Sequence, residues 1–299
     1  MGNRMFKKKI RFPFGLKQSI YLFLLVGIIY LLIRQINGYL FAALVILAVW
    51  EKITPRRRAR FPSVQRWTSN LGIFVFNTSL IQLAVIPVFS KFIGGSSLGN
   101  WALLDHISLP SLTLIIISIL LLDLTTYWIH RMFHAFSWSW KIHRVHHADL
   151  DMDVTTAQRF HPLEILVSVF IMQLFVLAIG PPMSAFVFYN ISVFLVGIFR
   201  HANIELPNPL QRLLNLVLVT PDMHLIHHSL NWKESNSNFG TNFPWWDRLF
   251  KTFLPSAKMP FSKMTLGISQ FRGPEVSNPW RILALPFLMN RSLFKKVRP

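Results

Sequence analysis

The chain has no cysteine and few acidic residues. It contains 12 Asp and Glu against 31 Lys and Arg in 299 residues. The lack of cysteine excludes disulfides, thiolate metal sites and cysteine nucleophiles, so a metal would need His, Asp, Glu or backbone oxygen as ligands. Charged residues make up only 14% of the chain, whereas a soluble domain carries about 25%. Together with long apolar runs, this composition predicts an integral membrane protein.

The excess of basic residues gives a net charge of +19, which would fit either nucleic-acid binding or the cytoplasmic face of a membrane protein. Their position favours the membrane. Basic residues are concentrated before Gln18 and again between Lys52 and Arg66, beside apolar segments, as the positive-inside rule describes. Nucleic-acid binding would need a basic groove with stacking aromatics. We therefore expect no nucleic-acid partner.

Apolar segments account for much of the remaining chain. They occupy residues 19–33, 39–50, 71–93, 109–129, 164–180 and 183–199. The first two are short for a span of about 20 residues, and Pro181 with Pro182 makes the last two a helical hairpin. We predict an all-α integral membrane protein with about four to six transmembrane or membrane-embedded helices and a cytoplasmic helical cap.

The basic residues also predict a topology. If both termini and the segments 130–163 and 200–299 are cytoplasmic, only Arg34 and Lys91 lie in outer loops. The cap then contains every histidine except His106. We expect a basic segment with a membrane hairpin at 1–66, a catalytic membrane domain at 67–255 and a basic cytoplasmic tail at 256–299.

The histidines are gathered in three short windows. "HRMFH" begins at His130, "HRVHH" at His143 and "HLIHH" at His224, and these windows hold eight of the eleven histidines. Within each window the outer histidines are spaced i, i+4 and share one helix face, so both imidazoles can point at one metal. Eight imidazoles exceed the roughly four to six ligands of one ion, which implies two metals; imidazole suits iron, zinc and copper.

In combination, these windows and their neighbours resemble the fatty acid hydroxylase superfamily, which includes sterol desaturases, sterol C4-methyl oxidases and alkylglycerol monooxygenase. The resemblance runs from about Leu122 to Phe253 and also includes "RFHPLE", "HANIELP", "NFG" and "WWDRLFKTF". It implies a membrane-bound non-haem di-iron enzyme that uses O2 to hydroxylate or desaturate an unactivated C–H bond of a lipid. The implied metal ligands are His130, His134, His143, His146, His147, His201, His224, His227 and His228, with His161 a further candidate.

Other groups should support this site. A ligating histidine usually donates its second ring N–H to a carboxylate or carbonyl, and we assign such partner roles to Asp123, Asp149, Asn203 and Asp247. The resemblance implies two irons, which zinc can replace on overexpression because imidazole accepts both metals. It also implies a membrane lipid substrate and electrons from an electron-transfer protein, a reductase or tetrahydrobiopterin.

Two other functions fit part of the sequence. One is a histidine-rich metal transporter, although the apolar segments hold few polar groups to form a path. The other is a zinc-dependent membrane hydrolase with Glu164 as its general base. For the oxygenase we expect a multi-pass protein of the bacterial inner membrane or endoplasmic reticulum, with its active site and both termini facing the cytoplasm.

Overall fold

The computed structural model describes residues 37–88 and 102–288. The chain divides into two compact units, Met1–Ala43 and Leu44–Pro299. Of the first unit only residues 37–43 are described, and they are helical; the second unit also begins with helix, over residues 44–53. In the described ranges every regular element is a helix, beside two isolated β-bridges. The predicted all-α class is confirmed, while the division at 1–66, 67–255 and 256–299 stays a prediction.

Four helices in the described ranges are long and apolar enough to cross a membrane: Ser63–Val88, α4 (Ser111–Ala135), α6 (Pro162–Ile179) and α7 (Met183–His201). The first consists of α2 (Ser63–Leu80), a π-helical turn (Ile81–Val85) and a last α-helical turn. Their mean hydropathies lie between 1.6 and 2.3, and no more than 33% of each apolar stretch is buried inside the protein. Such exposed apolar surface fits contact with lipid.

The predicted apolar segments agree with these helices, with one shift. The segments 109–129, 164–180 and 183–199 correspond to α4, α6 and α7, and 39–50 is helical. The segment 71–93 begins earlier than expected, at Ser63, so that Arg66 lies inside the helix and is buried. The segment 19–33 lies outside the described residues.

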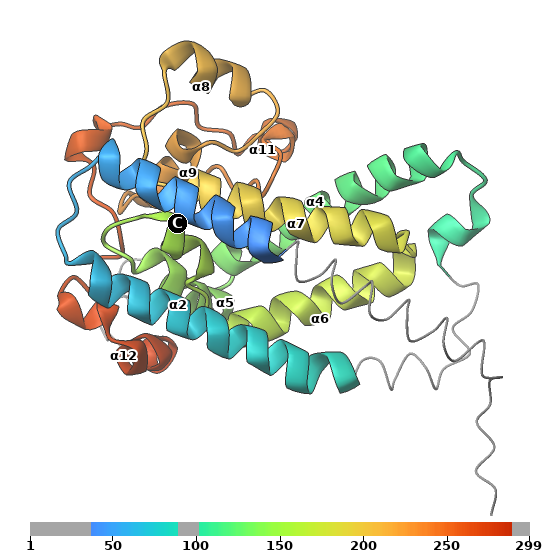
Figure 1. The fold of residues 1–299 in the computed structure, drawn as a ribbon, viewed down its shortest axis with the longest axis horizontal. Helices are drawn as coiled ribbons and strands as arrows, with labels where there is room; N and C mark the ends of the chain where they lie inside the picture. Colours follow the sequence, from blue (N-terminus) through green and yellow to red (C-terminus); the bar gives the residue numbers. More distant parts are fainter. Residues whose placement is uncertain (1–36, 89–101, 289–299) are drawn as a thin grey trace, which may run out of the picture. The chain divides into compact units, whose positions relative to one another are not determined.

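The turn between α6 and α7 is the predicted hairpin (Figure 1). Gly180 ends α6 in the left-handed conformation, with φ of 66°, and its N–H donates to the Val176 carbonyl at 2.8 Å. A Cβ at Gly180 would lie 2.3 Å from the Cβ of Ala102, so both conformation and space require glycine. Pro182 then precedes the first turn of α7.

Short helices gather around the opposite ends of these long helices (Figure 1). They include α5 (Ser137–His147), α8 (Asn208–Leu214), α9 (Pro221–His227), α10 (Trp232–Ser235), α11 (Trp245–Leu249) and α12 (Pro279–Ala284), with 3-10 turns at Val154–Gln158, Phe261–Lys263, Pro274–Ser277 and Leu285–Phe287. We call this group the cap. It carries the second and third histidine windows, whereas the first window lies at the end of α4.

Two arginines, one buried and one half-buried, hold the cap together. Arg159 is fully buried and donates to the Val145 carbonyl at 2.8 Å, to Asn70 Oδ1 at 3.0 Å and to the Val276 carbonyl at 2.6 Å. It therefore joins α5, α2 and the C-terminal segment. Arg57 donates to the carbonyls of Phe261 and Met264. Residues 256–288 are thus packed into the cap.

Candidate metal centre

Each histidine window lies on the helix that its spacing predicts. His130 and His134 occupy the last turns of α4, and His143, His146 and His147 end α5. His224 and His227 lie on α9, with His228 as its C-cap residue. The structure brings the ends of these three helices together with the last residue of α7, His201. Nine of the ten proposed ligands therefore meet, and they form two groups.

The first group, which we call the five-histidine cluster, takes imidazoles from three helices. One ring nitrogen from each member lies within 4.8 Å of the others. The Nε2 atoms of His134 and His147 are 3.1 Å apart. The members are His130, His134, His143, His147 and His227.

The second group, the four-histidine cluster, takes imidazoles from α5, α7 and α9 with its C-cap. Its Nε2 atoms are separated by 2.9 Å for His224 and His201, 3.2 Å for His201 and His146, and 3.2 Å for His228 and His224. Two nitrogens bound to one ion at about 2.1 Å and a right angle would lie about 3.0 Å apart. The spacing is that of adjacent ligands of a single ion.

The two clusters are direct neighbours. The adjacent residues His146 and His147 belong to different clusters, and the ring of His147 stacks on that of His228 with centroids 4.6 Å apart. The rings of His143 and His146 are 5.5 Å apart. Because rings of the two clusters touch, metals bound in both would form one binuclear centre.

Hydrogen bonds fix the orientation of several imidazoles. Nδ1 of His130 donates to the Phe239 carbonyl at 2.8 Å, and Nδ1 of His227 donates to the Ser237 carbonyl at 2.7 Å. Their Nε2 atoms are buried without a hydrogen-bond partner, although buried polar atoms normally have one. A proton on Nδ1 leaves a lone pair on Nε2, which is the state a metal ligand needs. The orphaned atoms thus fit a bound metal.

Glu164 is a site residue that we did not assign as a histidine partner from the sequence. It lies in the first turn of α6, and its Oε1 accepts a hydrogen bond from His143 Nδ1 at 2.5 Å. The Nε2 atom of His143 is buried without a hydrogen-bond partner. The available signal was the acid of "RFHPLE", placed where a helix enters an apolar run.

Burial keeps the imidazoles of the cap neutral. Burial lowers the pKa of His143 to about 3, with the nearby Arg200 guanidinium as a smaller cause. Burial likewise lowers the pKa of His146, His147, His224 and His227 well below the ordinary value, assisted by neighbouring histidines or by Arg200. Neutral imidazole is the form that binds metal.

The sequence was compared with known proteins. Residues 115–252 match the fatty acid hydroxylase family. Over this stretch the chain is similar to that family. This confirms the resemblance that its motifs predict.

Named relatives of the chain act on several lipids. It is 28% identical over 140 residues to ornithine lipid hydroxylase OlsE of Rhizobium tropici, covering 46% of this chain and 41% of the relative. Identity is 32% over 152 residues to alkylglycerol monooxygenase of Xenopus tropicalis, or 50% and 32% of the two chains. C-4 methylsterol oxidase of Schizosaccharomyces pombe is 29% identical over 136 residues, or 44% and 43%. The matches thus span less than half of each relative. No solved structure matches.

Two histidines lie outside both clusters. His161 is the N-cap of α6: its Nδ1 accepts from the Leu163 N–H at 3.1 Å, and its Nε2 lies 3.2 Å from the Leu283 carbonyl oxygen. His106 ends a short 3-10 turn that packs against α6 near Gly180, at the opposite end of that helix. The structure therefore separates His161 from the two clusters, and it separates His106 further.

Asp123 and Asp247 bind loop backbone in place of histidine. Asp123 accepts from the Asn242 and Phe243 N–H groups and, at 2.9 Å, from Trp246 Nε1. Asp247 accepts from the Phe239 and Gly240 N–H groups at 2.8 and 2.7 Å. Because the Phe239 carbonyl accepts a hydrogen bond from His130, Asp247 is linked through residue 239 to a proposed ligand.

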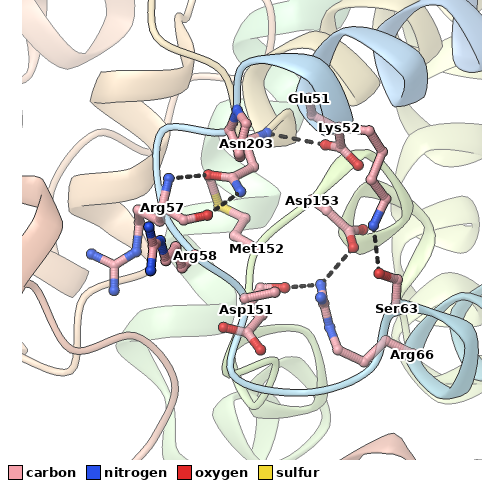
Figure 2. A pocket seen from close by; sticks show the side chains of 12 residues that line it. Glu51, Lys52, Arg57, Arg58, Ser63, Arg66, Asp151, Met152, Asp153 and Asn203 are labelled. Atoms are coloured by element: carbon pink, nitrogen blue, oxygen red, sulfur yellow. Dashed lines mark hydrogen bonds and ion pairs between the residues drawn. The ribbon is translucent and has the colours of Figure 1, made fainter.

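Asp149 and Asn203 belong to a polar network beside the clusters. Asp149 accepts from Arg66 Nε at 3.0 Å and from the Thr156 hydroxyl at 2.8 Å. Asn203 donates to the Arg57 carbonyl, and its N–H binds Glu51 (Figure 2). Neither bonds a histidine. As for Asp123 and Asp247, their role in supporting the ligands stays a prediction.

This network borders a small polar cavity. The cavity has a volume of about 150 Å³, and its walls carry carboxylates and basic groups side by side. Glu51 accepts from the N–H groups of Val154 and Asn203, both at 3.1 Å, and Arg66 pairs with Asp153 at 2.7 Å (Figure 2). No clustered histidine lines it. These bonds brace the loops that follow α5 and α7, the helices that end at His147 and His201.

Proposed function

We propose that this chain is a membrane-bound non-haem di-iron oxygenase, which hydroxylates or desaturates an unactivated C–H bond of a lipid. The single observation that carries the proposal is the convergence of nine imidazoles into two adjacent clusters at the ends of long apolar helices. The hydroxylase match supports it. Because a lipid C–H bond has no acidic proton, acid–base side chains alone cannot attack it.

Each of the two clusters would hold one of the two irons. The five-histidine cluster would hold one iron and the four-histidine cluster the other. Bound iron would supply the activation of O2 that the side chains lack. The donor set favours this use: it is all nitrogen, and imidazole suits iron as well as zinc.

The protein itself orients the ligands and excludes water. Glu164 and the Phe239 and Ser237 carbonyls hold three imidazoles by Nδ1, which fixes the direction of each Nε2 lone pair. Aromatic rings cover the imidazoles: Phe160 stacks on His146 with centroids 4.6 Å apart. Reactive oxygen chemistry at this centre would therefore take place away from bulk water.

The relatives support a substrate class, and the charge pattern supports a membrane topology. The relatives are named for ornithine lipids, alkylglycerols and methylsterols, which are all lipids. We extend a membrane lipid substrate to this chain. The lipid would enter from the bilayer, with the cap and both termini on the cytoplasmic side. Electrons would come from an electron-transfer protein, a reductase or tetrahydrobiopterin.

The proposal is tested by metal analysis, O2 consumption and lipid mass spectrometry on cells with and without the protein. We expect close to two metals per chain and lipids that gain one oxygen or lose two hydrogens. Zinc-dependent release of a hydrolysed lipid without O2 uptake would establish the hydrolase instead, and metal flux into proteoliposomes the transporter. A metal content near zero after gentle, chelator-free purification would contradict all three.

A further inference from the structure

A tryptophan lies against the five-histidine cluster. Trp140 is on α5, one turn before His143 and two turns before His147, so it shares their helix face. Its ring centroid lies 5.0 Å from that of His134 and 5.3 Å from that of His147. An indole therefore contacts two proposed metal ligands directly.

A second tryptophan extends this contact to the surface. Trp232, on α10, meets the Trp140 ring edge-on at 6.0 Å. Its residue surface is 53% exposed. The two indoles form a continuous ring contact from the outside of the protein to the five-histidine cluster.

The identity of these rings is informative. Indole is among the most easily oxidised side chains, whereas the phenyl ring of Phe resists one-electron oxidation. A second ring path leads from His130 through Phe239, at 5.6 Å, then Tyr127, at 6.3 Å, to Trp128, at 5.5 Å. That path contains a Phe and one ring more. The Trp140–Trp232 pair is the shorter path, and every ring in it can give up an electron.

We propose that Trp140 and Trp232 carry oxidising equivalents away from the metal centre when no lipid C–H bond is within reach. This inference rests on the proposed oxygenase function. One electron passes from Trp140 to the centre, Trp232 refills Trp140, and a water-soluble reductant such as ascorbate or a thiol refills Trp232. Two such electrons and two protons reduce one oxygen atom to water, so the ligands are spared oxidation.

The experiment uses the iron-loaded full chain without lipid substrate. The protein is reduced with a stoichiometric amount of dithionite under anaerobic conditions and then mixed with O2. Oxygen adducts on each tryptophan are mapped by peptide mass spectrometry. We expect several-fold more adducts on Trp232 than on Trp138, and ascorbate should lower the Trp232 adducts to the Trp138 level.

Trp138 and Trp280 are internal controls. Trp138 is 54% exposed, which matches Trp232, and Trp280 is 78% exposed; neither makes a ring contact with a histidine in the described part of the chain. If adducts follow exposure, Trp280 exceeds Trp232 and the inference is overturned. Adducts concentrated on Trp128 would also overturn the inference, because they would assign the electron transfer to the path through Phe239 and Tyr127.

Variants give an independent check. W232F should move adducts inward to Trp140, several-fold above wild type, and W140F should lower Trp232 adducts to the Trp138 level. W138F is the matched substitution and should change neither. Iron content is measured in each variant. Because Trp232 is at the surface, W232F tests the inference even if W140F loses iron.

The outcome is separable from that of the proposed function. If lipid product forms normally but Trp232 adducts stay at the Trp138 level, the route is wrong and the oxygenase stands. If the loaded protein neither consumes O2 nor forms lipid product, the oxygenase proposal fails and takes the route with it.

Discussion

The two histidine clusters are neighbours, but their supports differ. In the five-histidine cluster, His130, His143 and His227 each have Nδ1 bound to a carbonyl or to Glu164. In the four-histidine cluster only His201 has such a bond, to the Gly197 carbonyl at 2.7 Å. Outer hydrogen bonds of this kind orient ligands and raise metal affinity. We infer that the five-histidine cluster is the more pre-organised site.

The largest expected effect separates the clusters by mutation. His227→Ala and His224→Ala should each abolish lipid oxidation and each leave about one metal of two, because Ala provides no lone pair in place of imidazole. Metal per chain is measured by elemental analysis beside product formation. Full metal content and turnover in either variant would refute the assignment of that histidine.

Chelation should reveal unequal affinity in the unmodified protein. Metal should leave in two steps as the chelator concentration rises. The four-histidine site should lose its metal first, at a concentration about 10- to 100-fold lower than the five-histidine site. His224→Ala, which keeps the better supported site, should show the late step alone. Simultaneous loss of both metals in wild type would mean that the difference in hydrogen bonding does not matter.

Glu164→Gln should reduce the gap between the two chelation steps. Removal of a partner carboxylate typically costs about 10- to 100-fold in metal affinity or activity, and only His143 is held by Glu164. The late chelation step should move toward the early one. Glu205→Gln is the matched control, because the Glu205 side chain is 70% exposed and should leave both steps in place. An unchanged late step in Glu164→Gln would contradict the role of this carboxylate.

The sequence predicts which histidines share a helix face but not how they divide between clusters. The i, i+4 pair His143 and His147 meets in one cluster as expected. His146 goes to the other, because adjacent helical residues point about 100° apart and the packing of α5 against α9 and α7 decides what each meets. Glu164 was missed as a partner for the same reason: its contact with His143 depends on how α6 packs against α5.

Tertiary packing also determines which groups the buried acids bind. Asp123 interrupts an apolar run and was expected to hold a histidine, but the loop at Asn242 and Phe243 reaches it. Loop position across a helix bundle is set by tertiary packing and is not encoded in local spacing. The helices and the gathering of nine histidines were therefore predictable, whereas the hydrogen bonds around these histidines were not.

Members of both clusters are buried, and the dependence of stability on pH tests this shared property. Burial holds the folded-state pKa of His143 at about 3, while an unfolded histidine has a pKa of about 6.5. Its neutral, buried form contributes stability above pH 6.5 that is lost as pH falls toward the folded pKa, at about 1.4 kcal/mol per pH unit. Chelator-treated protein should therefore unfold at lower temperature at pH 5 than at pH 7. An unchanged midpoint would argue against a neutral, buried cluster.

The smallest expected effect concerns the histidine that stands apart at the start of α6. His161 accepts from the Leu163 N–H, and loss of a helix cap costs about 0.5–2 kcal/mol. His161→Ala should therefore lower the thermal midpoint slightly while both metals and their two chelation steps remain. His106→Ala, at the other end of α6, should change neither stability nor metal content. Loss of a metal from His161→Ala alone would show that His161 is a ligand, and would place a tenth imidazole in the centre.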